Sequence, residues 1–157
     1  MYQSVLKSKT YLVSSIKIAE SAKIIENIQR DVNIALINEL SMLFNELNID
    51  TEEILKAAET KWNFGSYRPG LVGGHCIGVD PYYLTYKANE IGFDTEIILK
   101  GRKINNEMHK YICNKFLKLL KIKKIHNINP KILIMGFAFK ENFDDIRNTK
   151  IYDLINE

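Results

Sequence analysis

The stretch that decides the fold is residues 16–47, which read IKIAESAKIIENIQRDVNIALINELSMLFNEL. Its apolar residues recur at intervals of three and four, which is the spacing of one face of an α-helix. They are Ala19, Ile24, Ile28, Val32, Ala35, Leu36, Leu40, Leu43 and Leu47. The pattern predicts one long amphipathic helix, and a helix of this length predicts a mainly α-helical domain.

A short helix and a long loop are expected next. Asp50 followed by Glu53 has the form of a capping pair, which predicts a second helix through Glu59. Residues 62–80 then hold five of the eight glycines and have neither a helical nor an alternating period. Loops of this length are uncommon in compact domains and are often functional.

Two more helices are predicted after the loop. Asp80-Pro81 has the residue types of an N-cap and first helical position, and Gly92 ends that helix after Ile91. Asp94 or Thr95 can cap a second long helix that extends to about Lys123. Its apolar residues at helical spacing are Ile97, Ile98, Ile104, Met108, Ile112, Phe116 and Leu119.

The last part of the sequence has the pattern of an α/β unit, a strand followed by a helix. Residues 131–139 form a short apolar run after Asn129-Pro130, which predicts a strand, and residues 151–155 predict a helix. A single strand cannot form a sheet. We therefore expect residues 128–157 to be the first strand and helix of an incomplete Rossmann-like α/β domain.

Composition excludes several functional classes. The 157 residues are 46% hydrophobic and 26% charged, as in a globular protein. No apolar run approaches the ~20 residues of a membrane-spanning helix, and residues 1–15 lack the features of a signal peptide. A net charge of +3 is too small to indicate nucleic acid as a partner. We expect a cytoplasmic protein without membrane or nucleic-acid contacts.

The two cysteines, Cys76 and Cys113, are interpreted as thiols, because a cytosolic chain with a sizeable core has little use for a disulfide. His109 lies four residues before Cys113, which is a spacing seen in metal sites. Two ligands do not make a zinc site, so we expect no metal.

Cys76 is a candidate nucleophile. It precedes a predicted helix N-terminus, whose partial positive charge, together with His75, favours the thiolate. The neighbouring Gly73, Gly74 and Gly78 permit unusual backbone angles and leave room for a ligand. The ordinary alternative is that Cys76 is a small buried hydrophobic residue and that the glycines only shape a turn.

Lys23 and Asn27 form a second candidate pair. They are four residues apart on the first helix, so both can address one bound group. The ordinary alternative is a surface lysine that pairs with Glu26. Asp80 likewise has an ordinary interpretation, as the N-cap of its helix.

Residues 73–83, GGHCIGVDPYY, resemble the active-site loop of the UDP-glucose/GDP-mannose dehydrogenase family. Within that family they are similar to the branch that acts on UDP-N-acetylhexosamines. The glucose branch has proline and lysine before the aspartate, where this chain has Gly78 and Val79. That difference argues against glucose as the sugar.

Two further stretches resemble the same family: residues 19–40, with AESAKIIEN, RDVNIA and NEL, and residues 136–147, with GFAFK and DDIR. The resemblance implies site residues of three kinds. They are Cys76, Lys23, Asn27 and Asp80 for catalysis, Arg68, Phe139 and Lys140 for substrate binding, and Arg147 for cofactor binding.

The resemblance also implies a reaction. The family oxidises a sugar hydroxymethyl group at C6 to a carboxylate with two molecules of NAD, for polysaccharide precursor synthesis. Cys76 is expected to capture the intermediate aldehyde as a thiohemiacetal and then to carry a thioester.

Domain organisation follows from the same resemblance. Residues 1–15 are expected to be the remnant of a linker, residues 16–127 the central helical domain with its cysteine loop at 62–80, and residues 128–157 the start of a UDP-binding domain. The family's N-terminal Rossmann domain binds NAD and supplies a glutamate base, and no glycine fingerprint precedes Tyr11. This chain alone is therefore expected to be inactive and to form a homodimer through the long helix.

Two alternatives belong to other functional classes. A non-catalytic helical dimerisation module could retain the sequence of such an enzyme without its activity. A cysteine hydrolase is disfavoured, because no convincing histidine is directed at the cysteine.

Overall fold

The computed structural model describes residues 2–125, 130–138 and 140–157. Helices account for all the regular secondary structure in these residues. They are η1 (Tyr2–Ser4), α1 (Ile16–Glu46), α2 (Thr51–Ala58), α3 (Asp80–Asn89), α4 (Glu96–Ile122) and α5 (Ile151–Asn156). The prediction of a mainly α-helical domain built on two long helices is confirmed. Within the described residues, no helix has the length and apolar character needed to span a membrane.

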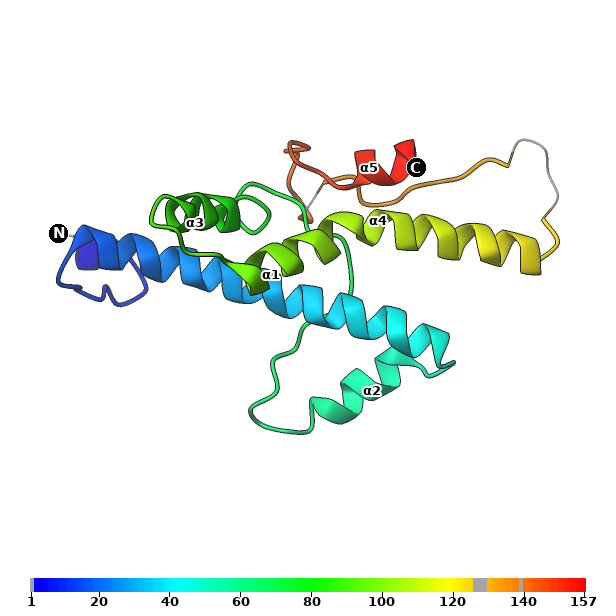
Figure 1. The fold of residues 1–157 in the computed structure, drawn as a ribbon, viewed down its shortest axis with the longest axis horizontal. Coiled ribbons are helices and arrows are strands. Elements are labelled where there is room, and N and C mark those ends of the chain that lie inside the picture. The colour runs from blue at the N-terminus through cyan, green and yellow to red at the C-terminus, as the bar shows by residue number, and fades with distance from the viewer. Residues whose placement is uncertain (1, 126–129, 139) are drawn as a thin grey trace.

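The long helices α1 and α4 form the frame of the molecule. They lie side by side and run in the same direction, with α4 beginning beside the middle of α1 (Figure 1). Two parallel neighbours need a long connection, and residues 47–95 supply it with α2, the glycine-rich loop and α3. Both α1 and α4 contact α3, whereas α2 contacts α1 and α5 contacts α4.

The helix starts show where local sequence rules hold. Asp50 caps α2 as predicted, because its carboxylate accepts a hydrogen bond from the Glu53 amide at 3.0 Å. The prediction of Asp80 as an N-cap is wrong: Val79 occupies that position and Asp80 is the first helical residue. The Asp80 carboxylate instead accepts a hydrogen bond from the Asn27 side chain.

The predicted strand is not formed in its described part, residues 131–138. This segment returns along α4 to α5 as an irregular trace (Figure 1, orange). The described residues offer it no neighbouring strand to complete a ladder, and an isolated strand has no backbone partners. Phe139 lies outside the described residues. The predicted helix at residues 151–155 is confirmed as α5.

Polar side chains fill the interface between α1 and α4. Asp31 and Asn38 of α1 are 0% exposed, and Arg102 and Asn105 of α4 are 2% and 1% exposed. Arg102 Nη1 donates to Asp31 Oδ1 at 2.6 Å, and Asn105 Nδ2 donates to the same oxygen at 2.7 Å. Burial raises the pKa of the Asp31 carboxyl, while Arg102 and Asn105 act in the opposite direction.

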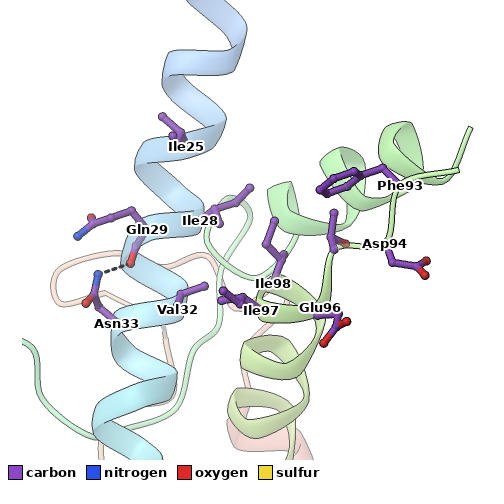
Figure 2. A pocket seen from close by; sticks show the side chains of 11 residues that line it. Ile25, Ile28, Gln29, Val32, Asn33, Phe93, Asp94, Glu96, Ile97 and Ile98 are labelled. Atoms are coloured by element: carbon purple, nitrogen blue, oxygen red, sulfur yellow. Dashed lines mark hydrogen bonds between the residues drawn. The ribbon is translucent and has the colours of Figure 1, made fainter. Parts of the chain in front are cut away.

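Many apolar side chains remain on the outside. An open groove of about 700 Å³ lies between α1 and the start of α4, with Ile25, Ile28 and Val32 on one wall (Figure 2). Phe93, Ile97 and Ile98 line the other wall. The predicted apolar face of the long helix is therefore only partly buried within this chain, because the α4 side of α1 is taken up by polar groups.

The buried Asp31–Arg102 pair predicts a specific stability effect. Replacing Arg102 with Met leaves a buried carboxylate without its counter-ion, and we expect unfolding in urea to lose about 3–5 kcal/mol. The double variant Asp31→Leu/Arg102→Met is expected to be more stable than the single variant, because it buries no charge.

The matched control is Arg30→Met. Arg30 forms an exposed pair with Glu26, so we expect its replacement to change stability by no more than about 1 kcal/mol. Equal losses from Arg30→Met and Arg102→Met would contradict this account of the interface.

Candidate functional site

Cys76 lies in the loop immediately before α3, as predicted. Its side chain is exposed. Its carbonyl oxygen accepts hydrogen bonds from the amides of Val79 at 3.1 Å and Asp80 at 2.8 Å, so the loop turns directly into the helix. Gly74 has a φ of +88°, in the left-handed region that favours glycine. Cys76 is therefore carried by a tight turn directly before α3.

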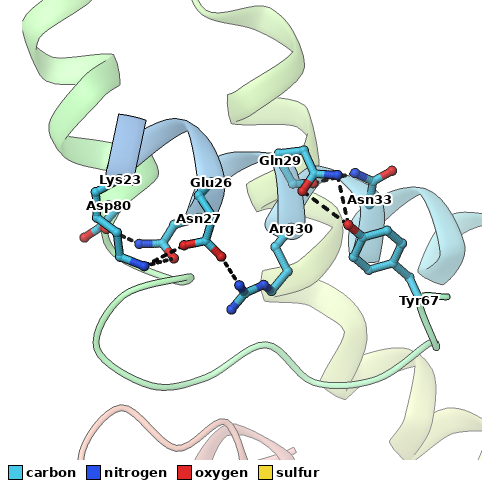
Figure 3. A network of polar contacts seen from close by, with 8 residues as sticks. All are labelled: Lys23, Glu26, Asn27, Gln29, Arg30, Asn33, Tyr67 and Asp80. Atoms are coloured by element: carbon cyan, nitrogen blue, oxygen red, sulfur yellow. Dashed lines mark hydrogen bonds and ion pairs between the residues drawn. The ribbon is translucent and has the colours of Figure 1, made fainter. Parts of the chain in front are cut away.

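A hydrogen bond ties this turn to α1. Asn27 is 1% exposed, and its Nδ2 donates to Asp80 Oδ2 at 2.5 Å. Figure 3 shows Lys23 beside this pair, with its Nζ 3.4 Å from Asn27 Oδ1. Asp80 thus bonds Cys76 through its backbone and Asn27 through its carboxylate. The structure brings the four predicted catalytic residues into one chain of contacts.

Lys23 also satisfies the ordinary interpretation of its position. Its Nζ lies 2.5 Å from Glu26 Oε2, and the side chain is 64% exposed. Glu26 in turn pairs with Arg30 (Figure 3). The Lys23 amine is consequently paired with the Glu26 carboxylate in an exposed position, where a ligand can reach it.

Arg68 is placed elsewhere. Its guanidinium donates to Glu59 Oε1 at 2.5 Å and to Oε2 at 3.0 Å. These hydrogen bonds lower the pKa of Glu59 and raise that of Arg68. Among the described contacts none joins Arg68 to Asn27 or Asp80, so the structure does not bring this predicted substrate residue into the cluster.

The segment after α4 lies against the cysteine loop. The Gly74 amide donates to the carbonyl oxygen of Asn148 at 3.2 Å, and His75 Nε2 lies 3.0 Å from Asp145 Oδ2. Arg147 donates to both oxygens of Asp145, and these bonds hold the pKa of that carboxyl well below its usual range. The predicted cofactor residue therefore lies in the segment that contacts the cysteine loop.

Two predicted substrate residues remain, Phe139 and Lys140. Lys140 is exposed, and Phe139 falls outside the described residues. A hollow of about 390 Å³ lies between the cysteine loop and α4, but neither Cys76 nor Lys23 lines it. No cluster of three or more His, Cys, Asp or Glu side chains in the described ranges is arranged to hold a metal ion.

Sequence reasoning assigned no role to Asn38, Arg102 or Asn105. Asn38 is fully buried and bonds both backbone polar groups of Gly70, which lies in the cysteine loop six residues before Cys76. The available signal was its spacing: Asn27, Asp31 and Asn38 fall on one face of a helix that also carries apolar residues. A polar stripe on a face that must be buried indicates a hydrogen-bonded interface.

The close approach of the two loops predicts the effect of a methyl group at Gly73. A Cβ there would lie 2.8 Å from the carbonyl oxygen of Asn148, so Gly73→Ala must displace residues 148–150. We expect a stability loss of about 1–3 kcal/mol and faster hydrogen exchange of the Gly74 amide.

Gly70→Ala is the matched control, because a Cβ at Gly70 has no atom within 4 Å. Thermal unfolding and amide exchange of both variants measure the difference. If Gly73→Ala behaves as Gly70→Ala does, the two loops are not packed as described.

Comparison with known sequences identifies the family of the chain. Residues 17–107, more than half of the chain, match the central domain of the UDP-glucose/GDP-mannose dehydrogenase family. The UDP-N-acetyl-D-glucosamine 6-dehydrogenase of Pseudomonas aeruginosa is 55% identical over 100% of this chain. A protein of the same name from Salmonella typhi is 56% identical. The chain spans 37% of the length of each.

Solved structures show the same arrangement. A UDP-D-ManNAc dehydrogenase from Pyrococcus horikoshii superposes with a TM-score of 0.84 at 30% identity, over 99% of this chain and 36% of that one. The UDP-N-acetyl-mannosamine dehydrogenase Cap5O from Staphylococcus aureus gives a TM-score of 0.79 at 33% identity, over 99% of this chain and 35% of that one. The chain therefore belongs to the UDP-glucose/GDP-mannose dehydrogenase family.

Proposed function

We propose that this chain is the catalytic-cysteine part of an NAD-dependent UDP-N-acetylhexosamine 6-dehydrogenase. The reaction is the four-electron oxidation of the C6 hydroxymethyl group to a carboxylate, for polysaccharide precursor synthesis. The activity named for the Pseudomonas and Salmonella relatives supports the substrate class. The observation that carries the proposal is the hydrogen bond between Asn27 and Asp80, which joins the long helix to the turn that holds Cys76.

In the proposed reaction the alcohol first loses a hydride from C6 and the hydroxyl proton, which gives an aldehyde. The Cys76 sulfur then bonds to the aldehyde carbon, and the thiol proton passes to the carbonyl oxygen, which gives a thiohemiacetal. Loss of a second hydride and the new hydroxyl proton gives a thioester. Water attacks the thioester carbon, the carbon–sulfur bond breaks, and the carboxylate and the thiol are released.

Lys23, Asn27 and Asp80 have distinct roles in this scheme. Asn27 and Asp80, which are already hydrogen-bonded, position the attacking water, and the Asp80 carboxylate can accept its proton. Lys23 stabilises negative charge on the substrate oxygen. Because that amine is paired with Glu26 at the surface, it can exchange a carboxylate partner for a developing oxyanion.

NAD, when bound, accepts the hydride in each oxidation. Arg147 is the residue of this chain proposed to contact it, and its side chain is 77% exposed although it also pairs with Asp145. The family resemblance assigns the other NAD contacts and the glutamate base to a Rossmann domain. Arg68, Phe139 and Lys140 stay predictions as substrate contacts, as does a cytoplasmic location. Residues 1–15, 16–127 and 128–157 remain the proposed linker, central domain and start of a UDP-binding domain.

A chimera tests the proposal. Residues 1–157 replace the matching segment of the Pseudomonas UDP-N-acetyl-D-glucosamine 6-dehydrogenase, and NADH formation is followed with UDP-N-acetyl-D-glucosamine as substrate. We expect turnover by the chimera, none by residues 1–157 alone, and a loss of acid formation of at least about a thousandfold in Cys76→Ser, because the nucleophile is removed.

Cys113→Ser is the matched control, since Cys113 is the other free cysteine and belongs to α4 rather than to the loop. We expect this variant to keep the turnover of the unmodified chimera. Acid formation by Cys76→Ser at an unchanged rate would remove this cysteine from the mechanism. A folded but inactive chimera would favour the non-catalytic dimerisation module.

We also propose a homodimer through the central helices. The apolar groove between α1 and α4 supports the dimer, because Ile97 is 72% exposed and lines the groove together with Phe93 and Ile25. Burial of such a surface favours association by about 25 cal/mol per Å² of apolar area removed from water.

Ile97→Glu is expected to shift the chain to a monomer in sedimentation velocity without loss of helical content, because it places a charge in the groove. Lys100→Glu, an exposed change on the same helix, serves as the control. An unmodified chain that sediments as a monomer at all concentrations would contradict the dimer.

A further inference from the structure

We infer that Asn38 is a positioning residue for the cysteine loop. Its side chain pairs with both backbone polar groups of Gly70: the Gly70 amide donates to Asn38 Oδ1 at 2.7 Å, and Asn38 Nδ2 donates to the Gly70 carbonyl oxygen at 3.0 Å. The Asn38 side chain thus satisfies both the N–H and the C=O group of Gly70 within the loop. The inference rests on the proposed function in one respect, the role of Cys76 as nucleophile.

The geometry leaves Asn38 little freedom. Its second Nδ2 hydrogen is donated to Asn105 Oδ1 at 2.9 Å, so both donor hydrogens and the acceptor oxygen are used. The Asn38 side chain is 0% exposed, and its bond to Asn105 is buried. A saturated, buried amide of this kind restricts the backbone that it holds, because displacement of Gly70 leaves polar atoms of the buried Asn38 side chain unpaired.

The same network reaches the other side of the loop. Asn105 and Arg102 both bond Asp31, and Arg102 Nη2 donates to Asn106 Oδ1 at 2.6 Å. Asn106 Nδ2 then donates to the hydroxyl oxygen of Tyr82 in α3 at 2.9 Å.

This network consequently contacts the chain on both sides of Cys76, at Gly70 before it and at Tyr82 after it. Both points are anchored to one buried cluster between α1 and α4. The Asn27–Asp80 bond is a third attachment, on the same side of the turn as Tyr82. Asn38, Asn27 and Lys23 all lie on α1. Asn38 therefore fixes the position of Gly70 relative to the helix that carries Lys23.

A purely structural role for Asn38 makes a different prediction. In that case Asn38→Ala would lower the free energy of unfolding without a selective effect on the loop. The matched control is Ile37→Ala, a cavity-forming change at the next residue of α1, where Ile37 is also buried. Loss of hydrophobic packing at Ile37 destabilises the fold without touching any hydrogen bond to Gly70.

The first measurement is amide hydrogen exchange of residues 1–157. In Asn38→Ala we expect protection of the Gly70, Gly74 and Asp80 amides to fall at least tenfold relative to the interior amides of α4. In Ile37→Ala we expect loop and helix amides to change in proportion. Proportional changes in both variants would overturn the inference.

The second measurement is steady-state kinetics of the chimera. A thiol that is displaced by about 1 Å is expected to lower kcat by 10- to 100-fold, and KM for the UDP-sugar should stay within about twofold. Ile37→Ala should leave kcat at 25 °C unchanged. A normal kcat in a folded Asn38→Ala chimera would overturn the inference.

A milder variant covers the case in which Asn38→Ala fails to fold. Tyr82→Phe removes only the hydroxyl that meets Asn106, and it should lower both loop protection and kcat by about threefold or more. A Tyr82→Phe protein with unchanged loop protection and kcat would count against the network. If the unmodified chimera does not oxidise the sugar, the proposed function fails, and the exchange data alone decide whether Asn38 positions the loop.

Discussion

The salt bridge between Asp31 and Arg102, with the amides of Asn38 and Asn105 around it, is the constraint on which the rest of the structure depends. Its carboxylate and guanidinium lie between two parallel helices and are removed from water. Among the described residues Asp31 Oδ2 and Arg102 Nε find no hydrogen-bond partner, so the cluster is weak as a source of stability. The pair fixes the register of the two helices: charges that must meet in the interior permit one alignment of α1 against α4, and that alignment positions Gly70 and Tyr82, on either side of Cys76 in the sequence.

Most of the helical fold could be predicted because its signals are local. The long helix at residues 16–47 is found as Ile16–Glu46, and the Asp50 cap forms as expected. The errors arise where a partner is remote in sequence. Asp80 bonds Asn27, 53 residues away, and so does not act as a cap. The expected strand at 131–138 needs a neighbouring strand that the described residues do not supply. The role of Asn38 could not be predicted either, because its partners Gly70 and Asn105 are 32 and 67 residues away.

For the candidate site, too, the residues could be named from the sequence, but the contacts between them could not. Resemblance to a family selected Cys76, Lys23, Asn27 and Asp80, and periodicity alone could place only the pair on the long helix. Tertiary structure adds what no local pattern contains: Asp80 is the residue through which the cysteine turn and the long helix meet. It also shows that Lys23 is held by Glu26, and that Arg68 is engaged with Glu59. Packing between Gly73 and residues 148–150 explains why glycine is required at that position.

The central claim is that Cys76 carries the acyl group while Asn27 and Asp80 direct water at it. Peptide mass spectrometry of the Asp80→Asn chimera, after incubation with UDP-N-acetyl-D-glucosamine and NAD, tests this claim most directly. Loss of the carboxylate slows hydrolysis, so a hydroxylamine-sensitive sugar adduct should accumulate on the peptide that contains Cys76. NADH formation without an adduct on that peptide, or an adduct on a different residue, would contradict the account.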